Sequence, residues 1–549
     1  MSPRIAAAAL LAAALAACSS EPPTADLALF GPVWTGDADR PVANAVAIRG
    51  DSILAVGDSA EVAAVVGPGT EVVTTSGLIL PAFADGHVHL LGTGAGLASV
   101  QLRDAATPDE FVRRIAEYAR TLAPGEWILE GNWDHETWGG ELPTRQWIDS
   151  VTPDNPVFVS RLDGHMALAN SKALELAGID RSMAEVPGGT IVRDATGELT
   201  GVLKDEAMNP VWAVVPEPSA EQADSAIAAA MRHANARGLA AISAVSASRL
   251  EIASVRRLRS AGLQTLRVSF YPPLGQWQWV AESLAANGPG DEWVRLAGVK
   301  GFVDGSLGST TALFFDPYLD EPGSIGLAVT PEPELRAMIG AADSAGLQVV
   351  VHAIGDRANA LLMDVFDSVA DAHGARDRRF RIEHAQHLRA REIEKMAISS
   401  VLASMQPYHA ADDGRWAAKR IREPQLRGTY AFRSILDAGG TLVFGSDAPV
   451  APIDPLLGIW AAVARQTIDG ANPDGWYPEQ RVTLEEALRA YTAANAFATF
   501  GEARRGVLRA GMLADVVVLD RDLRTVPPAE IPAGGVQATI VGGRVVHRQ

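Results

Sequence analysis

Two histidines separated by a single residue follow a short apolar stretch near the start of the chain. The stretch ends in Ala84, and Asp85-Gly-His-Val-His89 comes next. Residues i and i+2 of an extended strand point to the same side, so His87 and His89 can direct both imidazoles at one point. Imidazole nitrogens are common ligands of zinc and related divalent metals. The pair predicts half of a metal site, if other segments supply further ligands.

Further potential ligands stand at the ends of later apolar segments. They are Lys300, His352, His384 and Asp447. Counting the stretch before His87 and leaving out residues 125–218, the chain alternates eight strands with helices, which predicts a (β/α)8 TIM barrel. In such barrels chemistry occurs at the C-terminal ends of the strands. We therefore expect all six residues to meet at one mouth and to bind a divalent metal, zinc or a similar first-row ion.

The remaining segments predict the organisation around this barrel. Residues 26–80 and 503–549 both read as short strands separated by turns, and neither is long enough for a stable sheet alone. We expect them to form one small composite β-sandwich, with the barrel at 81–502. Residues from about 125 to 218 are rich in Gly, Pro and Trp and fit the alternation poorly, so we interpret them as an insertion.

Composition narrows the class of protein. The 549-residue chain has a formal net charge of −19, which argues against nucleic acid as a partner because no basic surface is available for phosphates. Its only cysteine, Cys18, follows an apolar run with Arg4 before it. Leu15-Ala-Ala-Cys18 resembles the lipobox of bacterial lipoproteins, which implies a signal peptide at 1–18, lipidation of Cys18 and a tether at 19–25. Ser19, in place of Asp, implies the outer membrane, with the lipid as the sole membrane contact.

The motifs together resemble the amidohydrolase superfamily, and within it the branch called amidohydrolase family 3, or YtcJ-like. The motifs are Asp85-Gly-His-Val-His89, Val299-Lys-Gly-Phe-Val-Asp-Gly-Ser-Leu-Gly-Ser309, His352-Ala-Ile-Gly-Asp-Arg-Ala358, Arg381-Ile-Glu-His-Ala-Gln386, Gly445-Ser-Asp-Ala-Pro449 and the tail Arg505–Leu519. The resemblance covers nearly the whole chain after the N-terminal segment. It also implies a β-sandwich beside the barrel.

The resemblance implies roles for the ligands. His87, His89 and Asp447 would hold one metal, His352 and His384 a second, and Lys300 would bridge them as a carboxylated lysine. A lysine reacts with CO2 only when neutral, and burial near cations lowers its pKa. Lys204 is a competing candidate for the bridge. Whether one or two ions bind stays open.

The expected reaction is hydrolysis of a non-peptide C–N bond of amide type in a small molecule, by a metal-bound hydroxide. The metal brings the pKa of bound water near 7, and Asp447 accepts its proton and passes it to the leaving group. His165, in Asp163-Gly-His165, and Asp304 are candidate substrate contacts. An esterase or lactonase using the same site, and a binding lipoprotein without catalysis, remain alternatives. The substrate and the oligomeric state are not predicted.

Overall fold

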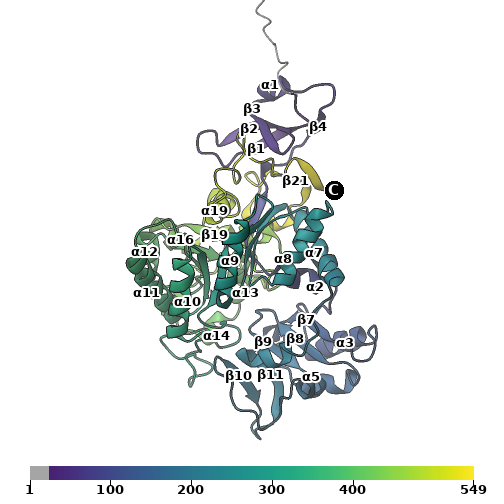
Figure 1. Ribbon diagram of the computed structural model, residues 1–549, viewed down its shortest axis with the longest axis vertical. Helices are drawn as coiled ribbons and strands as arrows, with labels where there is room; N and C mark the ends of the chain where they lie inside the picture. The colour runs from purple at the N-terminus through teal and green to yellow at the C-terminus, as the bar shows by residue number, and fades with distance from the viewer. Residues whose placement is uncertain (1–23) are drawn as a thin grey trace, which may run out of the picture.

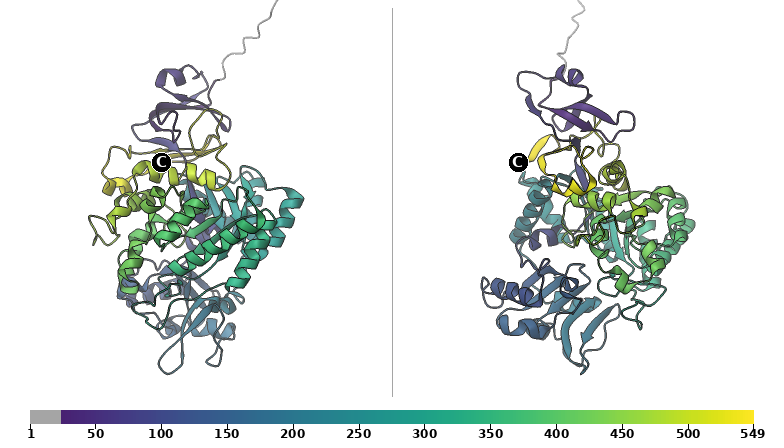
Figure 2. Two further views of the ribbon diagram at one scale, coloured as in Figure 1. Left: turned by 90° about the vertical axis from the view of Figure 1, so that its left-hand side faces the viewer. Right: turned by 180° about the vertical axis from the view of Figure 1, so that it is seen from behind.

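The computed structural model describes residues 24–549. The predicted signal segment, Cys18 and most of the predicted tether lie outside these residues. Three parts follow one another along the long axis (Figures 1 and 2). A sheet built from both chain ends lies at one end, helix-flanked parallel strands occupy the middle, and a second mixed sheet lies at the other end. Within the described part of the chain, no helix is both long enough and apolar enough to cross a membrane.

The sheet at the first end joins the two termini of the described chain. Its strands are β1 (Leu27–Trp34), β2 (Val42–Arg49), β3 (Ser52–Gly57), β4 (Glu71–Thr74), β5 (Ile79–Pro81), β20 (Val516–Leu519), β21 (Val536–Val541) and β22 (Arg544–Arg548). They form the order β22-β21-β20-β5-β1-β2-β3, with β4 also on β1. Leu80 pairs with Val517 where the two ends meet, and both ends fill one apolar core. A composite β unit is therefore present, with all its strands joined in one hydrogen-bonded sheet.

The middle part consists of two parallel sheets. One has the order β14-β13-β12-β6 and the other β15-β16-β17-β18-β19. Their bounds are β6 (Phe83–Val88), β12 (Leu239–Val245), β13 (Arg267–Tyr271), β14 (Val294–Leu296), β15 (Gly298–Phe302), β16 (Gln348–Ala353), β17 (Arg381–His384), β18 (Leu402–Met405) and β19 (Leu442–Phe444). Parallel bridges link the sheets at both edges, between Pro273 and Lys300 and between Val88 and Ala448. The α/β class is thus as predicted.

Helices between these strands form where the predicted apolar spacing occurs. In α7 (Ala220–Asn235), the Ser219 hydroxyl and the Gln222 side chain form a capping box, and the buried face includes Ile227, Met231 and Ala234. The other helices flanking the strands are α2 (Leu90–Gly96), α8 (Arg249–Ser260), α9 (Trp277–Asn287), α10 (Glu332–Ser344), α11 (Asp356–His373), α12 (Ala390–Ile398), α13 (Pro407–Asp413), α14 (Ala417–Arg420), α15 (Glu423–Arg427), α16 (Phe432–Asp437), α17 (Pro455–Ala464), α18 (Leu484–Ala490) and α19 (Ala493–Ala498). They bury the outer faces of the strands, so the strand ends alone remain open for chemistry.

The segment predicted as an insertion contains a sheet of its own. Its order is β10-β11-β9-β8-β7, made of β7 (Ile128–Trp133), β8 (Val157–Arg161), β9 (Met166–Ala169), β10 (Gly189–Arg193) and β11 (Leu199–Asp205). Short helices α4 (Arg145–Ile148), α5 (Ser171–Leu176) and α6 (Asn209–Trp212) accompany it. Helix α3 (Pro108–Ala119) also packs here, because Phe111 and Ile115 share an apolar core with Trp133. The extra unit thus begins before residue 125.

Candidate metal centre

The six predicted ligands line one cavity of about 310 Å³ at the C-terminal ends of the parallel strands. His87 lies on β6 and His89 is the N-cap residue of α2. Lys300 lies on β15, His352 on β16 and His384 at the end of β17, whereas Asp447 follows β19. Segments more than 350 residues apart in the chain therefore place their polar groups in one cavity, as the strand-end argument predicts.

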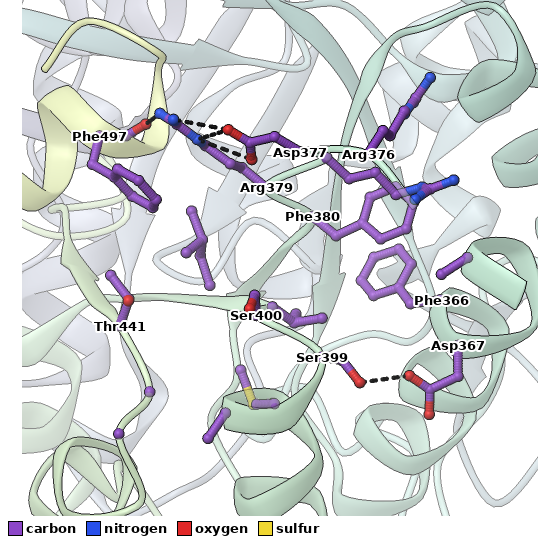
Figure 3. Close-up of a pocket in the computed structure, with 18 of the residues that line it drawn as sticks. Phe366, Asp367, Arg376, Asp377, Arg379, Phe380, Ser399, Ser400, Thr441 and Phe497 are labelled. Atoms are coloured by element: carbon purple, nitrogen blue, oxygen red, sulfur yellow. Dashed lines mark hydrogen bonds and ion pairs between the residues drawn. The ribbon is translucent and has the colours of Figure 1, made fainter. Parts of the chain in front are cut away.

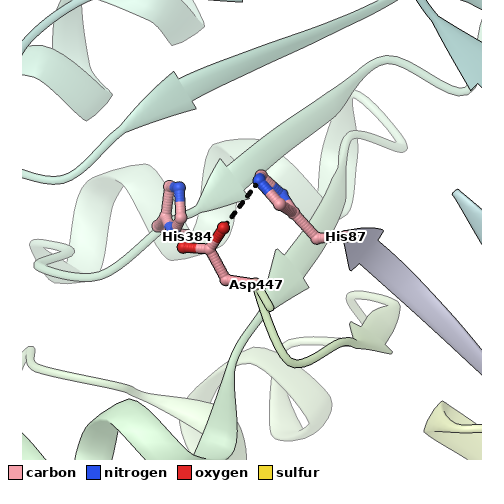
Figure 4. A group of neighbouring side chains, drawn as sticks. All are labelled: His87, His384 and Asp447. Carbon is pink, nitrogen blue, oxygen red and sulfur yellow. Dashed lines mark ion pairs between the residues drawn. The ribbon is translucent and has the colours of Figure 1, made fainter. Parts of the chain in front are cut away.

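The centre of this group is formed by His87, His384 and Asp447, whose side chains point toward one another (Figure 4). One potential ligand atom from each lies within 4.8 Å of the others. The Nε2 atoms of His87 and His89 both lie 3.3 Å from Asp447 Oδ1. Nitrogen and carboxylate oxygen at these separations form a donor set that suits a divalent first-row metal.

A hydrogen bond on one ring nitrogen orients each buried imidazole. His87 Nδ1 lies 2.5 Å from Glu383 Oε2, and His384 Nδ1 lies 2.8 Å from Gln406 Oε1. His352 Nε2 lies 3.0 Å from the carbonyl oxygen of Gly305. Each ring therefore donates an N–H outward and leaves its other nitrogen as an acceptor, which is how metal-binding histidines are usually held.

Burial sets the charge of these groups. It lowers the pKa of His87 to about 4, and the neighbouring Lys300 acts in the same direction. Burial also lowers the pKa of His352 and His384 well below the usual range. For Asp447 burial acts to raise the pKa, but His87 and the other imidazoles hold it well below its ordinary value. Neutral imidazoles and an ionised carboxylate are the protonation states that bind metals.

Backbone contacts hold Asp447 in place. Its N–H donates to the His87 carbonyl oxygen at 2.8 Å, and its φ is 64°. The Asp85 carboxylate accepts hydrogen bonds from the N–H groups of His87 and Ser446, at 3.1 and 2.9 Å. These bonds couple the end of β6 to the loop after β19. A left-handed backbone at a non-glycine residue is uncommon and is found repeatedly at functional sites.

Lys300 is buried and its Nζ has no hydrogen-bond partner among the described residues. Burial lowers the pKa of its ammonium to about 8, against the opposing effect of Glu383 and Asp447. Lys204, the competing candidate, donates from Nζ to the Ser309 carbonyl oxygen at 2.7 Å. It does not line the cavity. The geometry therefore favours Lys300 over Lys204.

The two predicted substrate contacts differ in position. His165, just before β9, lines the cavity, and its Nδ1 pairs with Asp205 Oδ1 at 2.7 Å. Asp304 was expected to contact substrate but is fully buried outside the cavity wall. Its carboxylate accepts hydrogen bonds from the N–H groups of Leu313, Ile354 and Gly355 at 2.7–3.0 Å. Asp304 therefore anchors the loop after β15 and the start of α11.

Sequence reasoning assigned no role to the residues that orient the ligands. Glu383 precedes His384 on β17, and it also accepts hydrogen bonds from Arg381 Nε and Ser404 Oγ, both at 2.8 Å. Gln406 comes directly after β18. The sequence feature that could have indicated these residues is the four-residue strand Arg381–His384. Three of its side chains are ionisable, although all four are buried. A buried strand with that composition needs internal partners for its charges.

The residues present fit a divalent metal. His87 Nε2, Asp447 Oδ1 and Lys300 Nζ are all buried and without a hydrogen-bond partner in the described part of the chain. Burying three such atoms beside one cavity destabilises the folded protein unless a ligand contacts them, because each atom loses its hydration without gaining a hydrogen bond.

A second, larger cavity lies at the opposite end of the parallel strands (Figure 3). It has a volume of about 660 Å³ and is lined by residues at the starts of β17, β18 and β19. Its charges are paired locally: Arg379 with Asp377 at 2.9 Å, and Asp367 with the hydroxyl of Ser399 at 2.8 Å. It contains no histidine. Volume alone therefore does not identify the site, and the smaller cavity carries the chemistry.

Comparisons with known proteins agree with this geometry. The sequence profile described as amidohydrolase family matches residues 75–547. Among curated relatives, Protein LONG AFTER FAR-RED 3 of Arabidopsis thaliana is 38% identical over 94% of this chain and 90% of its own length. YtcJ of Bacillus subtilis (strain 168), which is assigned as an amidohydrolase, is 30% identical over 88% of this chain and 91% of its own length. The N-substituted formamide deformylase of Arthrobacter pascens is 30% identical over 93% of this chain and 96% of its own length.

A solved structure extends the comparison to the fold. An uncharacterized metal-dependent hydrolase from Pyrococcus horikoshii OT3 superposes with a TM-score of 0.74 at 29% identity, covering 92% of this chain and 99% of its own. The similarity therefore extends over nearly the whole chain in both sequence and fold.

Proposed function

The chain belongs to the amidohydrolase family, and from this premise we propose that it is a metal-dependent hydrolase cleaving a non-peptide C–N bond of amide type in a small molecule. The observation that carries the proposal is the group of unpartnered buried atoms of His87, Asp447 and Lys300 in one cavity. Hydrolase relatives, one named for formamide substrates, support the same class of bond. The cavity volume of about 310 Å³ supports a small substrate.

His87, His89, His384, His352 and Asp447 would hold the metal, zinc or a similar divalent ion. Such an ion, when bound, acidifies water and polarises a carbonyl group. Asp447 receives the proton of the attacking water on its carboxylate and returns it to the leaving nitrogen. Glu383 and Gln406 keep His87 and His384 in the tautomers that present their free nitrogens to the cavity.

Two further residues complete this proposal. Neutral Lys300 would react with CO2 to form a carbamate, with release of one proton, and the carbamate oxygens would be ligands shared by two ions; its buried Nζ without a hydrogen-bond partner supports this role. An intact peptide mass without acid treatment tests the modification; an unmodified Lys300 in metal-loaded protein would contradict it. His165 contacts the substrate, because Asp205 occupies its Nδ1 and leaves its Nε2 free beside the cavity.

The architecture and location follow as proposals of the same kind. The two parallel sheets constitute one closed (β/α)8 barrel, in which β14 and β15, separated only by Ala297, count as one strand. The bridges at both edges of the sheets support this closure. Cys18 carries a lipid that anchors the protein in the bacterial envelope at the outer membrane, supported by the sequence around that cysteine. Radiolabelled palmitate incorporation by the full chain, and its loss in Cys18→Ala, tests the anchor.

The test of function is metal content and turnover in protein purified without chelator. We expect one to two ions per chain, falling to near zero in His87→Ala/His89→Ala, and hydrolysis of N-butylformamide. Butyl formate is the matched ester: preferential turnover of the ester would move the assignment to esterase or lactonase. No metal after incubation with zinc, manganese and bicarbonate, together with no turnover, would replace the enzyme by a binding protein.

A further inference from the structure

Two polar side chains on β7 of the extra unit face the cavity without partners. Glu130 and Asn132 both line the cavity beside the metal ligands. Both side chains are half-buried, and within residues 24–549 neither has a hydrogen-bond or ion-pair partner. Both residues lie on β7, and the cavity they both line brings their side chains to the same region of its wall. They therefore present a carboxylate and a carboxamide to the same part of the cavity.

The backbone of β7 is unusual at these positions. The φ angles of Glu130, Gly131 and Asn132 are 63°, 96° and 55°, all in the left-handed region. Gly131 cannot be replaced easily, since an added Cβ would lie 2.8 Å from Leu102 Cδ1. Asparagine tolerates this region, whereas glutamate seldom occupies it. Strained residues of this kind cluster in binding sites, where the strain holds a side chain in position.

Glu130 differs from the other carboxylates of the cavity wall outside the metal group. Asp163 pairs with Arg161 at 2.7 Å, and Asp412 pairs with Arg103 at 3.2 Å. Asp413 accepts hydrogen bonds from Gln386 and Tyr430 at 2.9 and 2.5 Å. Glu130 has no such partner.

The cations of the wall are already occupied. Arg161 contacts Asp134 at 3.3 Å as well as Asp163, and Lys300 belongs to the metal group. His165 is paired with Asp205 at 2.7 Å, and that carboxylate raises its pKa against the opposing effect of burial. Outside the metal group, an anionic substrate would therefore find no cation in the wall without a carboxylate partner. A cationic one would find Glu130, because a carboxylate removed from water gains most from a charged hydrogen-bond donor.

We propose that Glu130, assisted by the Asn132 side-chain oxygen, is the specificity residue of this site and receives an ammonium group of the substrate. The substrate class is then a small amide with a protonated amine at the end away from the scissile bond. This inference rests on the proposed hydrolase function. Burial raises the pKa of the Glu130 carboxyl to about 7, and an ammonium in hydrogen-bond contact favours its ionised form.

The consequence for specificity is a preference that depends on charge at constant shape. N-(4-aminobutyl)formamide and N-pentylformamide differ by an ammonium in place of a methyl group. Binding the methyl compound would cover the half-buried Glu130 carboxylate with an apolar group and leave it unpaired, which disfavours that compound. Since the ammonium is distant from the reacting carbonyl, the contact forms in both ground and transition states, and the preference should appear in KM.

The test compares these two amides in metal-loaded wild type, Glu130→Gln and the control Glu217→Gln. Glu217 is exposed and distant from the cavity wall. We expect Glu130→Gln to raise KM for the amino compound at least tenfold with kcat within threefold, and to leave KM for N-pentylformamide unchanged or lower. Glu217→Gln should match wild type on both. An unchanged preference in Glu130→Gln, in protein with wild-type thermal stability, would overturn the proposal.

A binding measurement separates this inference from the proposed function. Butylammonium and 1-butanol are titrated by calorimetry into wild type and Glu130→Gln, which requires no turnover. Tighter binding of butylammonium by wild type only would support the inference even if neither amide were hydrolysed. Hydrolysis of amides with equal butylammonium binding by both proteins would support the function and refute the role of Glu130.

Discussion

Two clusters of polar residues, most of them buried, lie close to the same cavity, and they are built in opposite ways. The metal group has the unpartnered atoms of His87, Lys300 and Asp447. The second cluster, which we call the seam, joins the extra unit to the loops after β18. Its members are Asp134, His135, Glu136 and Arg161 of the extra unit and Asp412, Arg415, Lys419 and Arg420 of the parallel-strand part.

Each charge of the seam has an ionic partner. Arg415 bridges the two parts by contacting Asp134 at 3.0 Å while also pairing with Asp412. Glu136 receives Lys419 at 2.9 Å and Arg420 at 3.0 Å. Burial alone therefore does not mark a functional polar group. The charged groups of the seam pair with one another and join the extra unit to the parallel-strand part, whereas the metal group keeps its unpartnered atoms until a ligand binds.

The largest expected effect is a loss of turnover on substitution in the metal group. Asp447→Asn keeps a ligand oxygen but removes the proton acceptor, so we expect kcat to fall about a thousandfold with a much smaller change in KM. Steady-state kinetics on protein matched for metal content measures this. Turnover close to that of wild type would remove Asp447 from the catalytic role.

A charge deleted from the seam should act on stability. Arg161→Ala leaves Asp134 and Asp163 buried with fewer cations, and we expect a loss of about 3–5 kcal/mol in the free energy of unfolding. Urea denaturation measures it. The control is Arg181→Ala, which breaks an exposed pair with Glu198 and should cost about 1 kcal/mol or less. Equal losses in both variants would mean that the seam does not stabilise the junction.

Glu383 tests whether the metal group depends on its hydrogen-bond partners. Glu383→Gln weakens the orientation of His87, and we expect about 10–100-fold lower metal affinity. Competition with a chromogenic chelator measures it. Glu392→Gln is the control, since Glu392 is also buried and arginine-paired but lies on α12. If Glu383→Gln binds the metal as tightly as Glu392→Gln and wild type do, His87 does not depend on the Glu383 hydrogen bond to act as a metal ligand.

The smallest effect is the pH dependence of one seam residue. His135 Nδ1 accepts a hydrogen bond from Arg161 Nε at 3.2 Å, and burial followed by the charge of Arg161 lowers its pKa from 6.5 to about 3. Between these values the unfolded chain binds the extra proton, so stability falls as pH decreases below 6.5. The loss at pH 5 is about 2 kcal/mol, at about 1.4 kcal/mol per pH unit.

His135→Asn should remove that part of the pH dependence. Thermal midpoints of both proteins are compared at pH 7 and pH 5, with His547→Asn on β22 as a control outside the seam. An identical pH dependence in His135→Asn and wild type would show that His135 does not contribute.

The sequence predicted much of the fold and the composition of the site. The alternation of apolar strands with capped helices such as α7 is a local property, and it predicted the parallel strands. The strand-and-turn patterns of residues 26–80 and 503–549 predicted a β unit built from both ends, whereas the pairing of β5 with β20 was seen only in the structure. Strand-end positions placed His87, Lys300, His352, His384 and Asp447 on one cavity. The boundary of the extra unit was predicted less well, because α3 resembles any amphipathic helix and its partner Trp133 lies in a later segment.

What the sequence determined by itself is the set of residue types and their spacing along strands, because the alternation of side chains and the order of parallel strands are periodic features of the chain. Only the tertiary structure decided which polar groups are satisfied. Asp304 and Glu130 are both acidic residues close to the site, yet three backbone N–H groups hold the first and none reaches the second. That difference depends on where distant segments place their donors, which no local pattern encodes.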